Sequence, residues 1–261
     1  MNNELTIGRS YAIMIRIFLC EEFMIKAVFF DLDGTLLYMN EPKFLEIYFE
    51  EMERWIKSKG LDAEKIIEGT KVGTRAMFKN DGRVTNEMVF FDAFENYMGE
   101  TTEEIINALD TYYDSAFDKT FASCKPNPYS KGIVRFCRDV GLKVILSTNP
   151  LFPKVATIKR MALSDLYEDD FDLVTTYENS SFCKPDPRYF HEIMHKFNLT
   201  PNEVIVFGNN TYDDGECALM AGLKCYIIES ENLIENEKST HDFERIKITD
   251  VVDAIKKSMD I

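Results

Sequence analysis

Two aspartates, Asp31 and Asp33, stand two residues apart at the end of a short apolar run and are followed at once by Gly34. Alternate residues of an extended segment point to the same side, so both carboxylates can reach one pocket. Because like charges this close repel, a proton, a metal ion or a cationic side chain must be shared between them. One carboxylate could then act as a nucleophile and the other as a general acid and base. The alternative is a pair of turn-forming aspartates that cap the next helix.

The residues that precede these aspartates predict a buried strand. Ala27 to Phe30 are apolar, too few for a helix, and followed by a Gly-Thr breaker. Comparable short runs occur at 144–146, 173–175, 204–207 and 225–228, each beside a helical stretch. This alternation predicts an α/β fold, a Rossmann-like parallel sheet with helices on both faces. Ligands bind such sheets at the carboxyl ends of the strands, where Asp31 is expected.

Between residues 39 and 125 the pattern changes from strands to helices. Apolar residues recur at helical spacing from Phe44 onward, and further helices are expected at 62–78, 86–98 and 102–120. We therefore expect an all-helical cap at 39–125, inserted into a core formed by residues 24–38 and 126–261, with a turn-rich return linker at 124–128. Residues 1–23 are interpreted as an N-terminal appendage or, alternatively, an extra helix packed on the core. The charged stretch 229–246 is interpreted as a solvated surface segment.

Three later motifs adjoin predicted strands and could complete a site. Ser147, Thr148 and Asn149 follow the strand at 144–146, where a hydroxyl could donate to a phosphoryl oxygen; the alternative is a cap on the next helix. Lys184 is followed by prolines that restrict the backbone, which favours a fixed role in a site. The alternative is that Lys184, like most single lysines, is an exposed surface residue. The last of them, the fourth motif of the chain, runs from Phe207 to Asp214, and its aspartates could simply favour a helix N-terminus.

The string Asp31-Leu32-Asp33-Gly34-Thr35 resembles the first motif of the haloacid dehalogenase-like superfamily, most of whose members are phosphohydrolases. In the register of that family, Thr148 matches the phosphate-binding hydroxyl, Asn149 its usual neighbour, and Lys184 the lysine that balances the carboxylates; Ser147 is the fallback for Thr148. The resemblance extends from Ile25 to about Ile228. It implies a phosphatase-type enzyme acting on phosphomonoesters, with a helical cap.

The fourth motif of this chain departs from the family pattern, which has two acidic residues supporting Mg²⁺. Counting back from Ala221-Gly222 places the first acid at Asn210 and the second at Asp214, with Asn209 as the alternative first position. Either way an amide replaces a carboxylate, and an amide oxygen brings no charge to a hard cation. Weaker Mg²⁺ binding is expected, and Asp213 is a conceivable substitute ligand.

The resemblance implies a mechanism in which Asp31 is the nucleophile and forms an aspartyl-phosphate intermediate. Asp33 would protonate the leaving alcohol and then deprotonate the attacking water. Mg²⁺ would bind the Asp31 carboxylate, the Asp33 backbone carbonyl and side chains of the fourth motif, at Asn210 and Asp214. Since dehalogenases of this superfamily lack the second acid, Asp33 argues against dehalogenation. A phosphomutase and a non-enzymatic binding protein remain as alternatives.

The overall composition limits the partners. The 261 residues contain 30 lysines and arginines against 45 aspartates and glutamates, a formal charge of −15. This acidity argues against nucleic acid or an anionic membrane and favours a small phosphorylated substrate held by a local positive site. The apolar patch from Tyr11 to Cys20 is too short and too charged to span a bilayer. Six cysteines without paired spacing indicate reduced thiols in a cytoplasmic protein. The sequence does not indicate an oligomeric state.

Overall fold

The structure is a computed structural model that describes residues 24–99 and 103–260; the predicted N-terminal appendage, residues 1–23, lies outside them. The strands are β1 (Ala27–Phe30), β2 (Leu37–Met39), β3 (Cys124–Pro126), β4 (Lys143–Leu146), β5 (Leu173–Val174), β6 (Val204–Gly208), β7 (Lys224–Ile228) and β8 (Glu244–Ile246). The helices are α2 (Glu41–Ser58), α3 (Ala63–Met77), α4 (Asn86–Met98), α5 (Glu103–Ser115), α6 (Ser130–Asp139), α7 (Lys154–Ala162), α8 (Arg188–Phe197), α9 (Cys217–Met220) and α10 (Val251–Ser258).

Six strands form one sheet in the order β5-β4-β1-β6-β7-β8, and every neighbouring pair is parallel. Side chains of β1 alternate between the two faces: Val28 and Phe30 join one hydrophobic cluster, whereas Ala27 and Phe29 join the other. Helices α6, α7 and α10 contribute to the first cluster, and α8 and α9 to the second. A sheet covered on both faces explains why its strands read as continuous apolar runs. The predicted α/β fold class is therefore confirmed.

The register of the sheet brings the ends of three strands together. Phe30 at the end of β1 is paired with Leu146 of β4 on one side and with Phe207 of β6 on the other. The Asp31 amide donates to the Phe207 carbonyl at 2.8 Å, and the Ser147 amide to the Phe30 carbonyl at 2.7 Å. The segments that follow β1, β4 and β6 therefore emerge at the same edge of the sheet.

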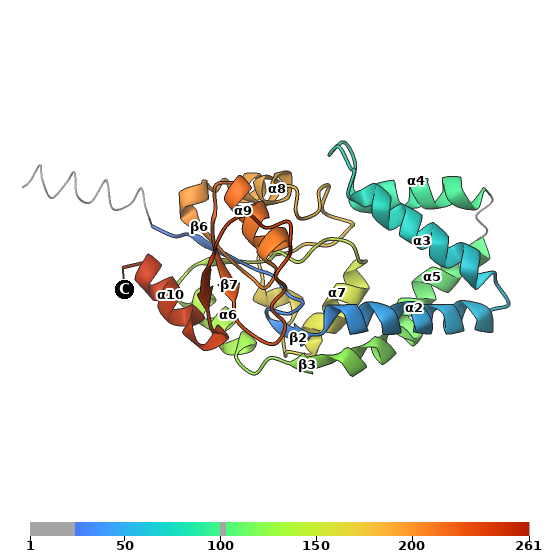
Figure 1. Cartoon of the computed structure of the whole chain (residues 1–261), viewed down its shortest axis with the longest axis horizontal. Helices are drawn as coiled ribbons and strands as arrows, with labels where there is room; N and C mark the ends of the chain where they lie inside the picture. The colour runs from blue at the N-terminus through green and yellow to red at the C-terminus, as the bar shows by residue number, and fades with distance from the viewer. Residues whose placement is uncertain (1–23, 100–102, 261) are drawn as a thin grey trace, which may run out of the picture.

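Four helices, α2 to α5, lie between β2 and β3, and Figure 1 shows them gathered at the end of the molecule opposite α10. Asn40, Asp62 and Thr85 cap the first three, each accepting a hydrogen bond from a first-turn amide. Gly73 of α3 lets α4 approach closely, since a Cβ atom there would lie 2.6 Å from the ring of Phe90. The first hydrophobic cluster runs without a break from β1 into these helices.

Three expectations about this region need correction. Residues 102–120 do not form one helix, because α5 ends at Ser115 and a 3₁₀ segment, Phe117–Ser123, turns the buried Phe117 towards Phe44. The expected linker at 124–128 begins with strand β3, which pairs antiparallel with β2 as a short ribbon. The stretch 229–246 is not only solvated surface, because it contains β8 and its Ile234 bridges to Asn210.

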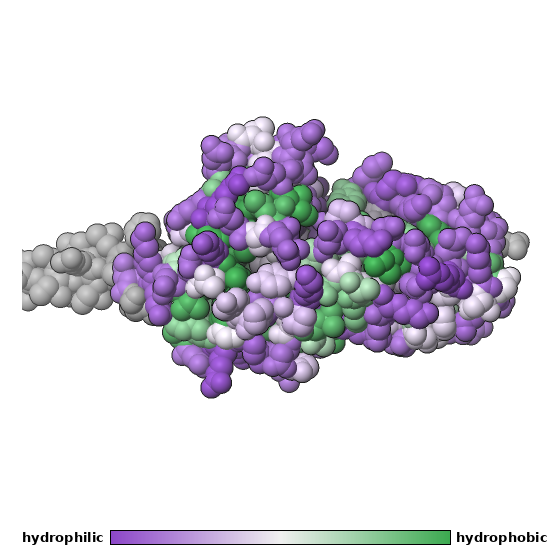
Figure 2. Space-filling view, turned by 60° about the horizontal axis from the view of Figure 1, so that its bottom comes forward, coloured by the Kyte–Doolittle hydropathy of each residue, from purple (hydrophilic) through white to green (hydrophobic). Residues whose placement is uncertain are grey.

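The surface agrees with the acidic composition: Figure 2 shows a face dominated by hydrophilic residues on core and cap, with apolar residues in separate patches. Within residues 24–99 and 103–260, no helix combines the length and apolar character needed to cross a bilayer. The five cysteines in the same ranges are free thiols.

Candidate active site

A pocket of about 90 Å³ opens at the carboxyl edge of the sheet, where the ends of β1, β4 and β6 meet. All seven residues predicted for the site line it: Asp31, Asp33, Thr148, Asn149, Lys184, Asn210 and Asp214. Asn209, Asp213, Glu41, Leu151, Phe152 and Ile234 complete its lining. The fold thus brings together motifs that are up to 183 residues apart, from Asp31 to Asp214.

Lys184 joins the first and fourth motifs. Its ammonium group lies 2.9 Å from Oδ1 of Asp31 and 2.5 Å from Oδ1 of Asp214, and only 1% of its side chain is exposed. Burial alone would lower the pKa of Lys184, but the two carboxylates raise it well above its ordinary value. Burial and the negative charges of Asp214 and Asp33 raise the pKa of Asp31 to about 8, against the opposing charge of Lys184. The lysine therefore stays protonated and favours the ionised form of Asp31.

Gly34 shapes the turn that follows the two aspartates. Its φ of +90° lies in the left-handed region, where side chains are strained, and a Cβ atom there would lie 2.0 Å from Nδ2 of Asn209. Asn209 is buried, donates to the Asn232 carbonyl at 2.7 Å and contacts the hydroxyl of Thr35. The glycine is thus required both by the turn and by the close approach of the fourth motif.

The Asp33 carboxylate has a partner that the sequence analysis did not identify. Nη1 of Arg160, on α7, donates to Oδ2 of Asp33 at 2.8 Å, while Oδ1 of Asp33 has no hydrogen-bond partner. The guanidinium is 1% exposed and lies 4.6 Å from the ring centre of Phe152. Burial raises the pKa of Asp33, and the charges of Arg160 and Lys184 oppose that shift.

A signal for Arg160 is present in the sequence. It lies four residues after Ala156, on the stripe of α7 that faces the core, and both residues are buried. An arginine on an apolar stripe requires a buried partner, because burying an unpaired charge is costly. Nothing local indicates that this partner is Asp33, 127 residues earlier in the chain.

The fourth motif begins with a π-helical turn, Thr211–Glu216, whose N-cap is Asn210. Oδ1 of Asn210 accepts hydrogen bonds from the amides of Tyr212 and Asp213, at 3.0 and 3.1 Å. Oδ2 of Asp214 accepts from the amides of Asn209 and Asn210, both at 3.0 Å, and its Oδ1 faces Lys184. Both side chains predicted as metal ligands in this motif are therefore already engaged in hydrogen bonds.

Asp213 differs from these two neighbours, because a single hydrogen bond, from Nδ2 of Asn210 at 3.2 Å, is formed to its carboxylate. Burial and the negative charge of Asp214 raise the pKa of Asp213 to about 6, against the opposing charges of Lys184 and Lys238. It is thus a carboxylate whose charge is incompletely compensated by the protein.

The phosphate-binding residues predicted from the second motif also line the pocket. Thr148 is buried, and its carbonyl accepts hydrogen bonds from the hydroxyls of Thr175 and Tyr189, which fix the backbone at this position. Asn149 donates to the Lys184 carbonyl at 3.3 Å, while its side-chain oxygen has no partner. Ser147, the fallback, is buried outside the pocket lining.

Glu41, the first residue of α2, links this pocket to the cap and was also missed by the sequence analysis. The surrounding protein removes part of its hydration and so raises the pKa of Glu41, and the carboxylates of Asp33, Asp213 and Asp214 raise it further. Five carboxylates thus line the pocket with one lysine, so the site carries excess negative charge.

The chain is an α/β protein whose parallel sheet carries paired acids and a buried lysine at its carboxyl edge. Residues 25–222 match the haloacid dehalogenase-like hydrolase family, and the chain belongs to this family. The predictions that the chain belongs to the phosphatase type of this family and that it is an enzyme are confirmed.

Two curated proteins are similar to most of the chain. The Bacillus subtilis (strain 168) protein described as "Putative phosphatase YhcW" is 25% identical over 211 residues, which cover 80% of this chain and 85% of that protein. The "Phosphorylated carbohydrates phosphatase" of Thermotoga maritima is 25% identical over 201 residues, covering 76% of this chain and 82% of its own length.

Solved structures share the fold. A 2-haloacid dehalogenase from Pseudomonas syringae pv. Tomato DC3000 superposes with a TM-score of 0.60 at 18% identity, covering 90% of this chain and 99% of that one. A HAD phosphatase from Thermococcus onnurineus gives a TM-score of 0.53 at 18% identity, with coverages of 88% and 98%. At these identities the similarity concerns the fold alone.

Proposed function

We propose that the protein is a Mg²⁺-dependent phosphohydrolase that acts on a small phosphorylated metabolite through an aspartyl phosphate on Asp31. The observation that carries this proposal is the contact of one buried lysine with both Asp31 and Asp214 at the bottom of a pocket lined by Thr148 and Asn149. A nucleophile, a cation and neutral hydrogen-bonding groups are the parts that in-line phosphoryl transfer requires. The free thiols fit a cytoplasmic location, which we include in the proposal.

In the first half-reaction, an oxygen of Asp31 forms a bond to phosphorus while the bond from phosphorus to the leaving oxygen breaks. Asp33 gives its proton to that oxygen, which leaves as an alcohol. In the second half-reaction, water attacks the phosphorus and loses a proton to Asp33, and the bond to Asp31 breaks. Arg160 holds Oδ2 of Asp33 and so fixes the orientation of the carboxyl group that transfers the proton.

The charge of the pocket supports a divalent cation in the proposed reaction. A phosphate dianion entering among five carboxylates meets one lysine and, behind Asp33, one arginine. Among the described residues, no three histidine, cysteine, aspartate or glutamate side chains are grouped to hold a metal unaided. That fits Mg²⁺, which usually takes one or two carboxylates together with water and substrate phosphate. The ion, when bound, supplies charge that offsets the repulsion between phosphate and nucleophile.

The residues that would hold Mg²⁺ are Asp31, the Asp33 backbone carbonyl and the fourth motif. Asn210 and Asp214 are the predicted ligands there, but both accept hydrogen bonds from backbone amides. We therefore add Asp213, whose carboxylate is less engaged, as the residue that replaces the missing acid. With this assignment the carboxylate ligands are Asp31, Asp213 and Asp214.

Hydrolysis of an artificial aryl phosphate, followed by release of inorganic phosphate, tests the proposal. The wild-type enzyme should turn over at millimolar Mg²⁺ and lose activity in EDTA, and Asp31→Asn should lower kcat by roughly 10³-fold or more, since the nucleophile is removed. Asp169→Asn, an exposed residue outside the pocket, is the matched control and should retain wild-type activity. Equal activity of Asp31→Asn and the control would refute the nucleophile.

Two alternatives from the sequence analysis remain as outcomes of the same experiment. A phosphomutase must also hold a substrate at a second phosphorylated position, yet the cap cavity described below is lined by no lysine, arginine or histidine among the described residues. We therefore favour hydrolysis. A wild-type protein without turnover at millimolar Mg²⁺ would instead favour a non-enzymatic binding protein.

A further inference from the structure

A second cavity, of about 360 Å³, lies between the cap helices and the core loop 151–153. It shares Glu41, Leu151 and Phe152 with the catalytic pocket, so the two are continuous at these residues. Its size is within the range of sites that enclose a small organic molecule. Because the phosphate belongs in the catalytic pocket, this cavity is where the group esterified to it would lie.

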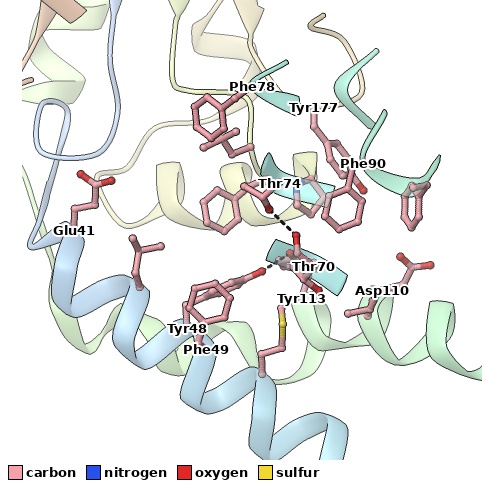
Figure 3. Close-up of a pocket in the computed structure, with 17 residues that line it drawn as sticks. Glu41, Tyr48, Phe49, Thr70, Thr74, Phe78, Phe90, Asp110, Tyr113 and Tyr177 are labelled. Atoms are coloured by element: carbon pink, nitrogen blue, oxygen red, sulfur yellow. Dashed lines mark hydrogen bonds between the residues drawn. The ribbon is translucent and has the colours of Figure 1, made fainter. Parts of the chain in front are cut away.

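The walls of the cavity are mostly apolar and aromatic, and Figure 3 shows rings directed towards one another across it. The aromatic lining consists of Tyr48, Phe49, Phe78, Phe90, Phe91, Tyr113, Phe152 and Tyr177. Leu45, Met52 and Leu109 add aliphatic surface. Burying hydrocarbon against such walls is favourable, whereas burying an unpaired hydroxyl group is not.

Several hydroxyl groups in the lining are already paired with one another or with the backbone. Thr74 donates to the Thr70 carbonyl at 2.9 Å, and Thr70 donates to the Ile66 carbonyl at 3.0 Å. The hydroxyls of Tyr48 and Tyr113 lie 2.9 Å apart and bond to each other (Figure 3). The donor hydrogens of Thr70 and Thr74 are therefore already used, and these residues offer a carbohydrate acceptor oxygens alone.

The charges at the cavity disfavour a second anionic group on the substrate, although Arg160 lies 4.6 Å from the ring centre of Phe152 in the lining. Glu41 and Asp110 lie on opposite sides of it in Figure 3, and its described lining residues include no cation. The nearby cations of α3 do not contribute: Arg75 is paired with Glu68 on the surface, and Lys71 lies close to the same glutamate. A carboxylate or second phosphate would therefore be buried without a counter-ion.

We propose that the leaving group of the substrate is an uncharged alkyl or aryl alcohol, which fills the cap cavity while its phosphate occupies the catalytic pocket. The inference rests on the proposed phosphohydrolase function and narrows its substrate class. The proposed substrate class differs from the phosphorylated carbohydrates in the description of the Thermotoga maritima relative.

A series of n-alkyl phosphates from ethyl to hexyl tests the proposal, since their leaving alcohols differ little in acidity. Each methylene that enters the cavity should raise kcat/KM by roughly threefold to fourfold. We expect hexyl phosphate to exceed ethyl phosphate by at least roughly tenfold, and to exceed glucose 6-phosphate, which has a comparable number of carbon atoms. Equal kcat/KM values across the alkyl series, or a higher kcat/KM for glucose 6-phosphate than for hexyl phosphate, would overturn the proposal.

Substitutions of residues that line the cavity test whether the effect of chain length on kcat/KM arises there. Leu45 and Phe78 line it and are partly exposed, at 37% and 48%, so Leu45→Ser and Phe78→Ser should fold. Each should reduce kcat/KM for hexyl phosphate more than for ethyl phosphate. Met88→Ser is the matched control, because Met88 is an exposed apolar residue of α4 outside the lining. An equal loss for both substrates in the cavity variants would contradict the assignment.

Binding of n-alkyl phosphonates, measured by calorimetry, separates the two proposals, because their P–C bond resists hydrolysis. Affinity that rises with chain length in the wild type but not in Phe78→Ser supports the cavity assignment even if no ester is hydrolysed. Turnover that depends on Asp31, with no chain-length effect on rate or binding, would leave the proposed function intact and refute this inference.

Discussion

At the scale of single residues, the contact between Arg160 and Asp33 bears most directly on the proposed reaction. Asp33 must hold a proton when the alcohol leaves and must have lost it when water attacks. Burial favours the protonated form, and the nearby guanidinium favours the ionised form, so the pair keeps the pKa of Asp33 between these extremes. Arg160 touches no reacting atom in this scheme and is a positioning residue. It donates to Oδ2 and so fixes the orientation of the Asp33 carboxyl group.

We predict that Arg160→Met shifts the alkaline limb of the pH profile of kcat/KM to higher pH. Removing the positive charge raises the pKa of Asp33, so Asp33 keeps the proton needed by the leaving group to higher pH. Arg160→Lys, which keeps the charge, should shift the limb less. A variant with lower activity but an unchanged profile would mean that Arg160 acts only through packing against Phe152.

At the scale of elements, the π-helical start of the fourth motif decides which acid faces the pocket. The amides of Asp214 and Gly215 both donate to the Asn210 carbonyl, so this turn is wider than a regular helical turn. The carboxylate of Glu216, at the end of this turn, accepts hydrogen bonds from the amides of Thr240 and His241 and so ties the turn to the segment 240–241. Such single-turn π segments are frequent at functional sites.

This element shows where sequence reasoning succeeded and where it could not. The first motif could be recognised because it is contiguous and follows a buried strand, and the lysine motif because its lysine and prolines are contiguous. The ligand in the fourth motif could not be chosen among Asn209, Asn210 and Asp213, because the winding of the turn sets which side chain points inward. Ribbon β2–β3 was missed because three residues per strand are too few for a period to be visible. We propose that the domain boundaries lie in this ribbon, near the expected residues 39 and 125.

We predict that Asp213→Asn raises the Mg²⁺ concentration needed for half-maximal activity by roughly 10- to 100-fold. The variant removes a carboxylate whose oxygens are largely free of hydrogen bonds within the protein. Titration of phosphate release with MgCl₂ at constant ionic strength measures this effect. Asp253→Asn, an exposed acid of α10 distant in sequence from every motif, should leave the titration unchanged. If Asp213→Asn also matched the wild type, the predicted pair Asn210 and Asp214 would have to suffice.

At the scale of the whole molecule, the hydrophobic cluster that runs from β1 into the cap couples the two parts mechanically. Phe152 of the core loop packs against Phe44 and Tyr48 of α2 and against Phe117, so cap and core share one aromatic cluster. Neither part can expose this surface alone without losing favourable apolar burial. Core and cap should therefore unfold together.

The single tryptophan, Trp55, provides a probe for this prediction because it lies in cap helix α2 and donates to the Ala108 carbonyl at 2.8 Å. We predict that thermal unfolding followed by Trp55 fluorescence and by far-UV circular dichroism gives one midpoint. Mg²⁺ at about 100 times its Kd should stabilise the protein by about 2.7 kcal/mol and raise both midpoints equally, although the proposed ligands all lie in the core. NaCl at matched ionic strength is the control. A Trp55 transition that precedes the circular dichroism transition, or that Mg²⁺ leaves unmoved, would mean that the cap unfolds independently.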